Sequence, residues 1–218
     1  MKDRSSPLEA GVSGLLVVDV QEAFLRRGKG FYADPDPKRW PAAKLDAYFA
    51  AVEGRVLPNA RRLTRAFRAA GQEVLFTVIQ SLTRDGRDRS LDHKLSHFHI
   101  PKGDPGGRIP PELELGEDEI VVPKSASGVF NATNIEYLLR NLGISDLVLF
   151  GVFTDQCVES AVRDASDRGF YVTLVGDACA GTTPDAHERS VAAMAAYGRV
   201  RTTEEILVEL AAMKGKAA

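Results

Sequence analysis

The sequence predicts one α/β domain in three layers: a doubly wound, mostly parallel β-sheet with helices on both faces. Short apolar segments rich in β-branched residues alternate with amphipathic segments along the whole chain, which is the order of a parallel α/β fold. The apolar segments are nearly continuous, as is typical of strands buried on both faces of a sheet. A length of 218 residues suits a single domain, in which we expect residues 1–12 to form a flexible tail.

Six segments have the character of strands, and we expect right-handed crossovers between them. They are residues 15–20, 74–79, 120–122, 147–152, 171–175 and 199–201. Five further segments repeat apolar residues at helical spacing. They are residues 55–70, 133–142, 155–168, 184–197 and 203–214. Glycine ends each of the first three helices, and Thr183 followed by Pro184 is a typical start for the fourth.

Two long stretches interrupt the alternation of strands and helices. Residues 24–40 and 81–119 contain many glycines and prolines, and each stretch comes after a predicted strand. Open α/β sheets bind ligands at the carboxyl ends of their strands, and long loops in compact domains are commonly functional. We therefore expect these two insertions to wall a pocket.

Charge balance and hydropathy exclude several functional classes. The chain has 28 Lys and Arg against 30 Asp and Glu, so it lacks the basic excess that nucleic-acid binding requires. No apolar run approaches the roughly 18 residues of a membrane-spanning helix, and the first residues do not resemble a secretory signal. Gly-rich fingerprints for dinucleotides or phosphates are also missing. We expect a cytoplasmic protein without a cofactor, whose partner is a small-molecule substrate rather than a nucleic acid or a membrane.

The two cysteines, Cys157 and Cys179, are too few for a disulfide framework. Cys157 follows a predicted buried strand and falls in the first turn of a predicted helix, where the helix dipole and free N–H groups lower the pKa of a thiol. It is either a nucleophile or a small buried residue, and its position alone favours neither. Cys179 has no such surroundings, and we expect it to be a packing residue.

Two charged residues lie at the ends of other predicted strands. Asp19 ends the first strand and Lys124 follows the third. Taken singly, Asp19 is also compatible with a turn cap and Lys124 with a solvated surface lysine. In a parallel sheet, however, the carboxyl ends of all strands meet at one edge. We therefore expect Asp19, Lys124 and Cys157 to converge on one crevice.

Three sequence blocks at these positions resemble the signature of the isochorismatase-like cysteine hydrolases. They are Asp19 with Gln21, Lys124 with residues 125–133 behind it, and residues 151–158 around Cys157. The blocks occur in the family's order, and the resemblance covers most of the chain. It implies the fold of that family.

The resemblance also implies a site and a reaction. Asp19, Lys124 and Cys157 would form a catalytic triad, and the bond between Val152 and Phe153 would be a cis peptide. The backbone N–H groups of Phe153 and Cys157 would form an oxyanion hole. Family members that cleave a vinyl ether do not use a nucleophilic cysteine, so Cys157 favours hydrolysis of a C–N bond through a covalent acyl intermediate.

Within the family, the sequence is similar to the branch that acts on ureidoacrylate, biuret and N-carbamoyl amino acids. We expect a cysteine amidohydrolase of a small amide, ureide or carbamoyl compound. Polar residues at strand ends and loops are candidates for binding this substrate. They are Gln21, Gln80, Arg84 and Asn131. Family members are often dimers or tetramers, so we also expect a homo-oligomer.

Two alternatives stay open. One is a nicotinamidase-like enzyme acting on a cyclic amide, but the Asp-x-His metal motif of such enzymes is missing after the second strand. His93, His97 and His99 occur later in the same insertion, and we expect them to be loop or pocket-wall residues rather than metal ligands. The other alternative is a non-catalytic protein that binds a small molecule or senses oxidants through Cys157.

Overall fold

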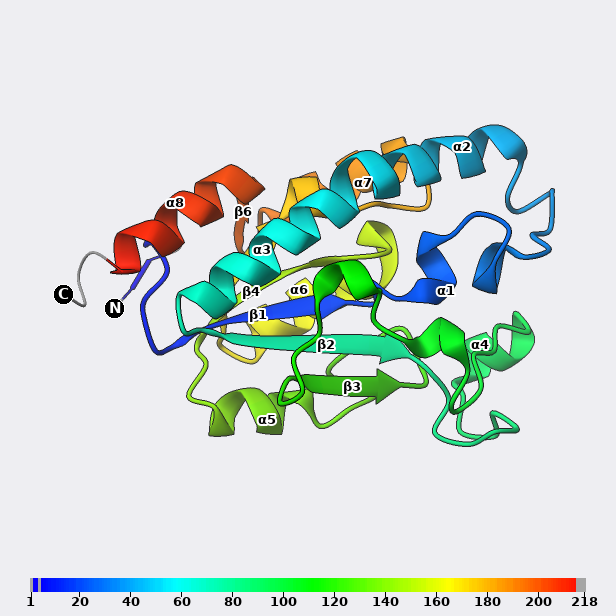
Figure 1. The fold of residues 1–218 in the computed structure, drawn as a ribbon, viewed down its shortest axis with the longest axis horizontal. Helices are drawn as coiled ribbons and strands as arrows, with labels where there is room; N and C mark the ends of the chain where they lie inside the picture. Colours follow the sequence, from blue (N-terminus) through cyan, green and yellow to red (C-terminus); the bar gives the residue numbers. More distant parts are fainter. Residues whose placement is uncertain (1, 4, 215–218) are drawn as a thin grey trace.

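A computed structural model describes residues 2, 3 and 5–214 of the chain, and Figure 1 shows its fold. Six parallel strands form one sheet in the order β3-β2-β1-β4-β5-β6. The strands are β1 (Ser13–Val18), β2 (Glu73–Ile79), β3 (Ile120–Lys124), β4 (Asp146–Gly151), β5 (Tyr171–Val175) and β6 (Arg199–Arg201). The winding reverses between β1 and β4, which is where open α/β sheets form a ligand crevice.

Helices cover both faces of this sheet, which confirms the predicted fold class. Figure 1 shows α3 (Leu57–Ala69) running along β1 and β2 beside α8 (Thr203–Lys214), with α5 (Ile135–Asn141) on the opposite side of the sheet. On another part of the sheet, α6 (Glu159–Asp167) packs on β5 and contacts α7 (Pro184–Met194). Buried residues at helical spacing dock α3 on the strands. They are Ala60, Leu63 and Phe67.

The helices differ from the sequence prediction mainly at their starts. Helix α2 (Ala42–Ala51), which no periodic pattern indicates, runs through a π-helical segment, Val52–Val56, directly into α3. The chain after β4 likewise passes through a π-helical turn, Thr154–Val158, before α6 begins. Cys157 therefore lies in this turn rather than in the first turn of an α-helix. The short helix α1 (Glu22–Leu25) leads into the first insertion, and the second insertion contains α4 (Leu91–Leu95).

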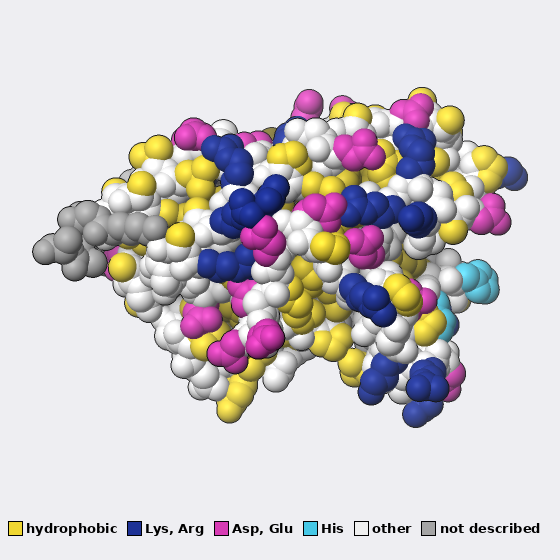
Figure 2. All heavy atoms as spheres, viewed as in Figure 1, with side chains coloured by type: hydrophobic (Ala, Val, Ile, Leu, Met, Phe, Trp, Pro, Cys, Tyr) yellow, Lys and Arg dark blue, Asp and Glu magenta, His cyan; other side chains and the backbone are white. Residues whose placement is uncertain are grey.

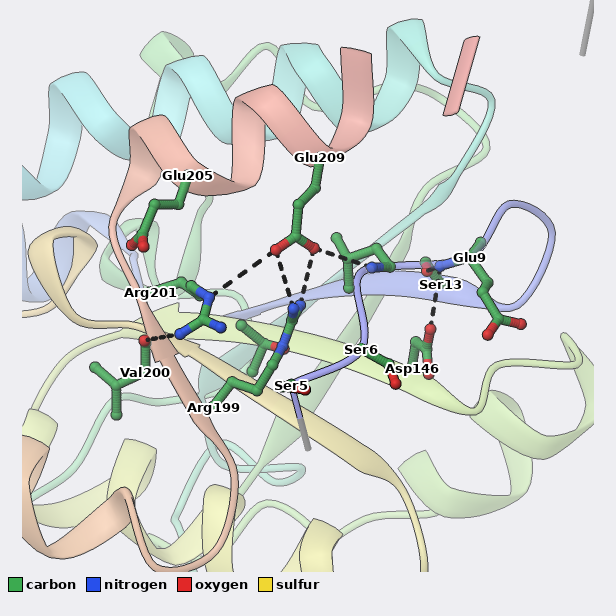
Figure 3. A network of polar contacts seen from close by, with 12 residues as sticks. Ser5, Ser6, Glu9, Ser13, Asp146, Arg199, Val200, Arg201, Glu205 and Glu209 are labelled. Carbon is green, nitrogen blue, oxygen red and sulfur yellow. Dashed lines mark hydrogen bonds and ion pairs between the residues drawn. The ribbon is translucent and has the colours of Figure 1, made fainter. Parts of the chain in front are cut away.

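Leu8, within the expected N-terminal tail, contacts the domain. The side chain of Leu8 is buried, and its N–H donates to Glu209 of α8 at 2.9 Å. Glu209 also pairs with Arg199 of β6 at 2.9 Å, so one carboxylate joins the tail, a strand and a helix (Figure 3). These contacts lie at the amino end of the strands, at the opposite edge of the sheet from Asp19.

The face seen in Figure 2 carries basic and acidic side chains in alternation, without a large area of one sign. Ion pairs also join separate elements, among them Arg68 of α3 with Glu119 at 2.7 Å. This intermixing on the visible face is in keeping with the small net charge of -2. Among the described residues, no helix has the length and apolar character needed to cross a membrane.

Candidate active site

Asp19, Lys124 and Cys157 meet in the interior at the carboxyl edge of the sheet. Asp19 follows β1, Lys124 ends β3 and Cys157 lies in the turn after β4, so the parallel register brings together residues far apart in sequence. The Nζ atom of Lys124 is 2.8 Å from Oδ2 of Asp19 and 3.4 Å from Sγ of Cys157. All three side chains are almost fully buried. The structure thus brings the three predicted residues into direct contact.

The ammonium group of Lys124 is held by more than its two side-chain partners. It also donates to the backbone carbonyls of Ala126 and Ser127, each at 3.0 Å. Burial alone lowers the pKa of Lys124, but the charges of Asp19 and Cys157 outweigh burial, so its pKa lies above its ordinary value. Lys124 is therefore a fixed cation between the carboxylate and the thiol.

Asp19 has its own support from β2, which the sequence analysis missed. The hydroxyl of Thr77 donates to Oδ1 of Asp19 at 3.0 Å, and both side chains are fully buried. The backbone N–H of Asp19 donates to the carbonyl of Thr77 at 3.1 Å. Thr77 pairs with Val18 across the β1–β2 ladder. The position of Thr77 beside Asp19 could be predicted only from the register in which β1 and β2 pair.

The pKa of the Cys157 thiol is raised, whereas the sequence predicted that it would be lowered. Burial raises the pKa of Cys157 to about 12. The positive charge of Lys124 lowers this pKa, but the negative charge of the Asp19 carboxylate opposes the effect of Lys124. A helix terminus favours the thiolate, but the cost of burying the thiolate charge has the larger effect on the pKa of Cys157. The resting thiol is therefore protonated, so attack on a carbon atom needs a base to accept the proton. Asp19 is placed for this task.

This charge state predicts how Cys157 reacts with iodoacetamide. Because burial raises the pKa of Cys157 to about 12, the thiol form dominates at about pH 7 and the thiolate fraction grows as the pH rises. We expect the alkylation rate of the resting protein to climb from about pH 6 to about pH 9 without a plateau. Mass spectrometry of the Cys157 peptide measures this rate, with Cys179 as an internal buried thiol. A plateau below about pH 7 would show a preformed thiolate instead.

The turn that carries Cys157 is fixed to neighbouring loops. The peptide bond between Val152 and Phe153 is cis. Thr154 donates its backbone N–H to the carbonyl of Ala180 at 2.9 Å. The carboxylate of Asp155 accepts from the N–H and the hydroxyl of Thr182 at 2.8 and 2.6 Å. A rigid turn of this kind can present backbone N–H groups in a constant direction.

Half-buried His187 of α7 also supports this turn. One of its ring nitrogens, Nδ1, lies 2.9 Å from the hydroxyl of Thr154. His187 falls within residues 184–197, which the sequence predicts to be helical. The polar partner of its ring could not be read from helical spacing.

A pocket opens beside Cys157, and the two insertions supply most of its wall. Its apolar side chains are Phe24, Phe31, Trp40, Ile79, Phe98, Val152 and Phe153, and its polar ones are Arg39, Asp92, His93, Ser96, Ser127 and Gln156. The aromatic rings contact one another, for example Phe31 with Phe98 at 5.2 Å and Trp40 with Phe153 at 5.8 Å between centroids. Such a wall favours a flat or apolar group on a ligand.

None of the four side chains predicted to bind substrate lines this pocket. Gln21 is fully buried and bonds to backbone groups only: it donates to the carbonyls of Ile79 and Gly106 and accepts from the N–H of Ile79. Gln80 lies beside Gly107, and Arg84 and Asn131 are exposed away from the pocket. Gln21 therefore links the first strand end to the second insertion, and the pocket residues replace these four as candidates for substrate contact.

The three histidines of the second insertion do not lie in one site. His93 lines the pocket, whereas His97 and His99 border a separate hollow beside Phe31. Within the described ranges, no group of three or more His, Cys, Asp or Glu side chains has the arrangement of a metal site. Cys179 is buried, with its Sγ atom 3.3 Å from the carbonyl of Val175, as suits a packing residue.

Comparison with known proteins agrees with this fold. The family model for the isochorismatase domain matches residues 13–205. The uncharacterized isochorismatase family protein YddQ of Bacillus subtilis is 27% identical, covering 89% of this chain and 98% of that protein. Ureidoacrylate amidohydrolase RutB of Serratia proteamaculans is 30% identical, covering 80% of this chain and 70% of that protein. The crystal structure of a cysteine hydrolase from Pseudomonas syringae has a TM-score of 0.80 at 21% identity, over 95% of this chain and 96% of that one. The chain therefore belongs to the isochorismatase family of hydrolases.

Proposed function

We propose that the protein is a cysteine amidohydrolase, which cleaves a C–N bond of a small amide, ureide or carbamoyl compound through an acyl intermediate on Cys157. One observation carries the proposal: the buried thiol of Cys157 lies in the wall of a pocket, and behind it the buried ammonium of Lys124 contacts both the thiol and the carboxylate of Asp19. Burying charged groups is costly, and active sites are where such groups are concentrated. The similarity to RutB, described as a ureidoacrylate amidohydrolase, supports the same reaction type.

The first half of the reaction forms the acyl enzyme. Asp19 accepts the proton of the Cys157 thiol as the sulfur attacks the carbonyl carbon of the substrate. The resulting oxyanion is stabilised by the backbone N–H groups of Phe153 and Cys157. Asp19 then passes the proton to the leaving nitrogen, the C–N bond breaks, and ammonia or an amine departs. Lys124 stays cationic throughout and balances the charge that moves between thiol and carboxylate.

The second half of the reaction regenerates the thiol. Asp19 accepts a proton from a water molecule, whose oxygen attacks the thioester carbon. The tetrahedral intermediate collapses, the C–S bond breaks, and Asp19 returns the proton to the sulfur of Cys157. The products of the whole cycle are ammonia or an amine and an acid, which a carbamoyl substrate releases as carbamate.

Ammonia release from a panel of candidate substrates tests this function. The panel contains ureides, N-carbamoyl amino acids and aromatic primary amides, and we expect turnover of at least one of them. If none is hydrolysed, the proposed reaction is wrong, and a role in binding a small molecule or in redox sensing through Cys157 becomes the better account. In that case, oxidation by hydrogen peroxide would modify Cys157 and change ligand binding.

The aromatic wall of the pocket favours a second candidate, an amidase that acts on a cyclic planar amide. Phe24, Phe98 and Phe153 can stack against a ring, whereas a short ureide would place its N–H and carbonyl groups against apolar rings. The panel separates the two candidates by the acyl group that gives the highest kcat/KM. Metal analysis of the purified protein shows in addition whether this chain shares the metal dependence of nicotinamidases.

The hydrogen bond from Thr77 to Asp19 can be tested by substituting Thr77. In Thr77→Val, the hydroxyl that holds Oδ1 of Asp19 is lost while the shape of the side chain is kept. We expect kcat to fall about tenfold with little change in KM, because a misplaced base slows proton transfer rather than binding. The matched variant Thr77→Ser keeps the hydroxyl and should recover most of kcat. Equal activity of Thr77→Val and the unchanged protein would contradict this role.

A further inference from the structure

A buried imidazole in the pocket wall has a ring nitrogen without a partner. His93 lies on α4, is 5% exposed, and lines the same pocket as Cys157. Its ring packs edge-on against Phe98, with 4.9 Å between the centroids. Its Nδ1 atom is buried, and no group in the described part of the chain forms a hydrogen bond with it. Buried polar atoms are nearly always hydrogen-bonded, so Nδ1 is suited to a bond with a bound molecule.

The surroundings of His93 also define its charge. Burial lowers the pKa of His93, and the positive charge of Lys124 lowers it further, so the ring is neutral at about pH 7. A backbone interaction with Ser125 acts in the opposite direction and raises the pKa of the ring, which is the effect of a carbonyl acceptor. A carbonyl can only accept, so the nitrogen that faces it carries the proton. Because Nδ1 has no partner, we assign the proton to Nε2, which makes Nδ1 an acceptor.

We propose that His93 is a specificity-determining residue whose Nδ1 atom accepts a hydrogen bond from an N–H of the scissile amide or carbamoyl group. The inference rests on the amidohydrolase function proposed above and adds to it a group that recognises the leaving nitrogen. Asp19 moves protons between sulfur, nitrogen and water, whereas His93 holds the nitrogen in place.

This role separates amides from esters. An ester with the same acyl group has an oxygen where the amide has its N–H group, and it cannot donate to Nδ1 of His93. A site with an acceptor built for an N–H group discriminates against an analogue that lacks the donor, because the buried acceptor then stays unpaired. Loss of the imidazole should therefore affect the amide far more than the ester.

The test compares two substrates in three variants. The substrates are the primary amide from the panel with the highest kcat/KM and the methyl ester of the same acid. His93→Phe keeps an aromatic ring against Phe98 but removes the acceptor, and His93→Gln restores an acceptor oxygen. Exposed His97 on the same insertion provides the matched control, His97→Asn.

We expect His93→Phe to lower kcat/KM for the amide by about 10- to 100-fold while the ester changes by less than about threefold. His93→Gln should recover most of the amide activity, and His97→Asn should match the unchanged protein with both substrates. Equal losses for amide and ester, or no loss with either, would overturn the role of His93 and leave the amidohydrolase function intact. Absence of amide turnover by the unchanged protein would instead overturn the proposed function, and this inference with it.

Discussion

Replacing Cys157 with alanine is expected to reduce ammonia release from the best substrate by at least about 10³-fold in kcat/KM. The substitution removes the atom that forms the covalent bond, while the pocket and the Asp19–Lys124 pair remain. Residual activity at the level of the background reaction would agree with the proposed chemistry. The measurement is the rate of ammonia formation at saturating and limiting substrate.

Cys179 offers a matched control for this substitution. It is also buried, and burial raises its pKa to about 12 as well, but it packs against the carbonyl of Val175 and lies outside the pocket. Cys179→Ala removes a sulfur atom from the interior at a similar structural cost. We expect it to keep close to full activity. Activity of Cys157→Ala equal to that of Cys179→Ala would rule out Cys157 as the nucleophile.

Replacing Lys124 with methionine is expected to impair both stability and activity. The side chain of Lys124 is fully buried and contacts Asp19, Cys157 and two backbone carbonyls. Methionine fills the volume but leaves the carboxylate of Asp19 buried without a counter-ion, which typically costs about 3–5 kcal/mol. For a chain of this size that corresponds to a fall in Tm of roughly 6–20 °C. Thermal unfolding followed by circular dichroism measures this fall.

A second variant shows whether the loss of stability comes from the unpaired charge. Asp19→Asn in the Lys124→Met background removes the buried carboxylate, so the double variant should be more stable than Lys124→Met while remaining inactive. Because the folded pKa of Lys124 is raised, the stability it contributes is present at pH values below its unfolded pKa and is lost only as pH rises through the folded value. The comparison at about pH 7 therefore measures the full effect. Equal stability of Lys124→Met and the unchanged protein would contradict the pairing.

The sequence predicts both the parallel sheet and the site at its edge for the same physical reason. The site contains Asp19, Lys124 and Cys157. Strands buried on both faces have continuous apolar runs, and such runs mark β1, β2, β4 and β5 clearly. Once the strands are parallel, their carboxyl ends must share one edge. No long-range contact had to be known to bring these residues together.

The two insertions were predictable as the walls of a pocket, but the side chains that form the wall were not, because the wall results from packing between two irregular segments. Phe24 and Phe31 from the first insertion contact Phe98 from the second, Trp40 packs on Phe31, and neither segment has a periodicity that fixes these contacts. The placement of Gln21 shows the same limit. The backbone of Asp19 is left-handed, with φ of 55°, which the sequence does not indicate. Two residues later, the Gln21 side chain forms hydrogen bonds with the backbone of Ile79 and Gly106 and does not line the pocket.

The raised pKa of Cys157 shows which part of the site chemistry depends on burial. The position of the thiol near a helical turn was readable from the sequence, but the degree of burial and the distance to Asp19 were not. Burial changes the expected mechanism from attack by a preformed thiolate to attack assisted by a base. The iodoacetamide profile and the Thr77 variants address these two features separately.

Partitioning of the acyl enzyme between water and hydroxylamine tests the central claim most directly. An amide and a methyl ester with the same acyl group differ only in the group that leaves before the acyl enzyme forms. If both pass through acyl-Cys157, a fixed hydroxylamine concentration must give the same ratio of hydroxamate to free acid from either substrate, and the account predicts this equality. Ratios that differ with the leaving group, or acid formation without any hydroxamate, would contradict a covalent intermediate on Cys157.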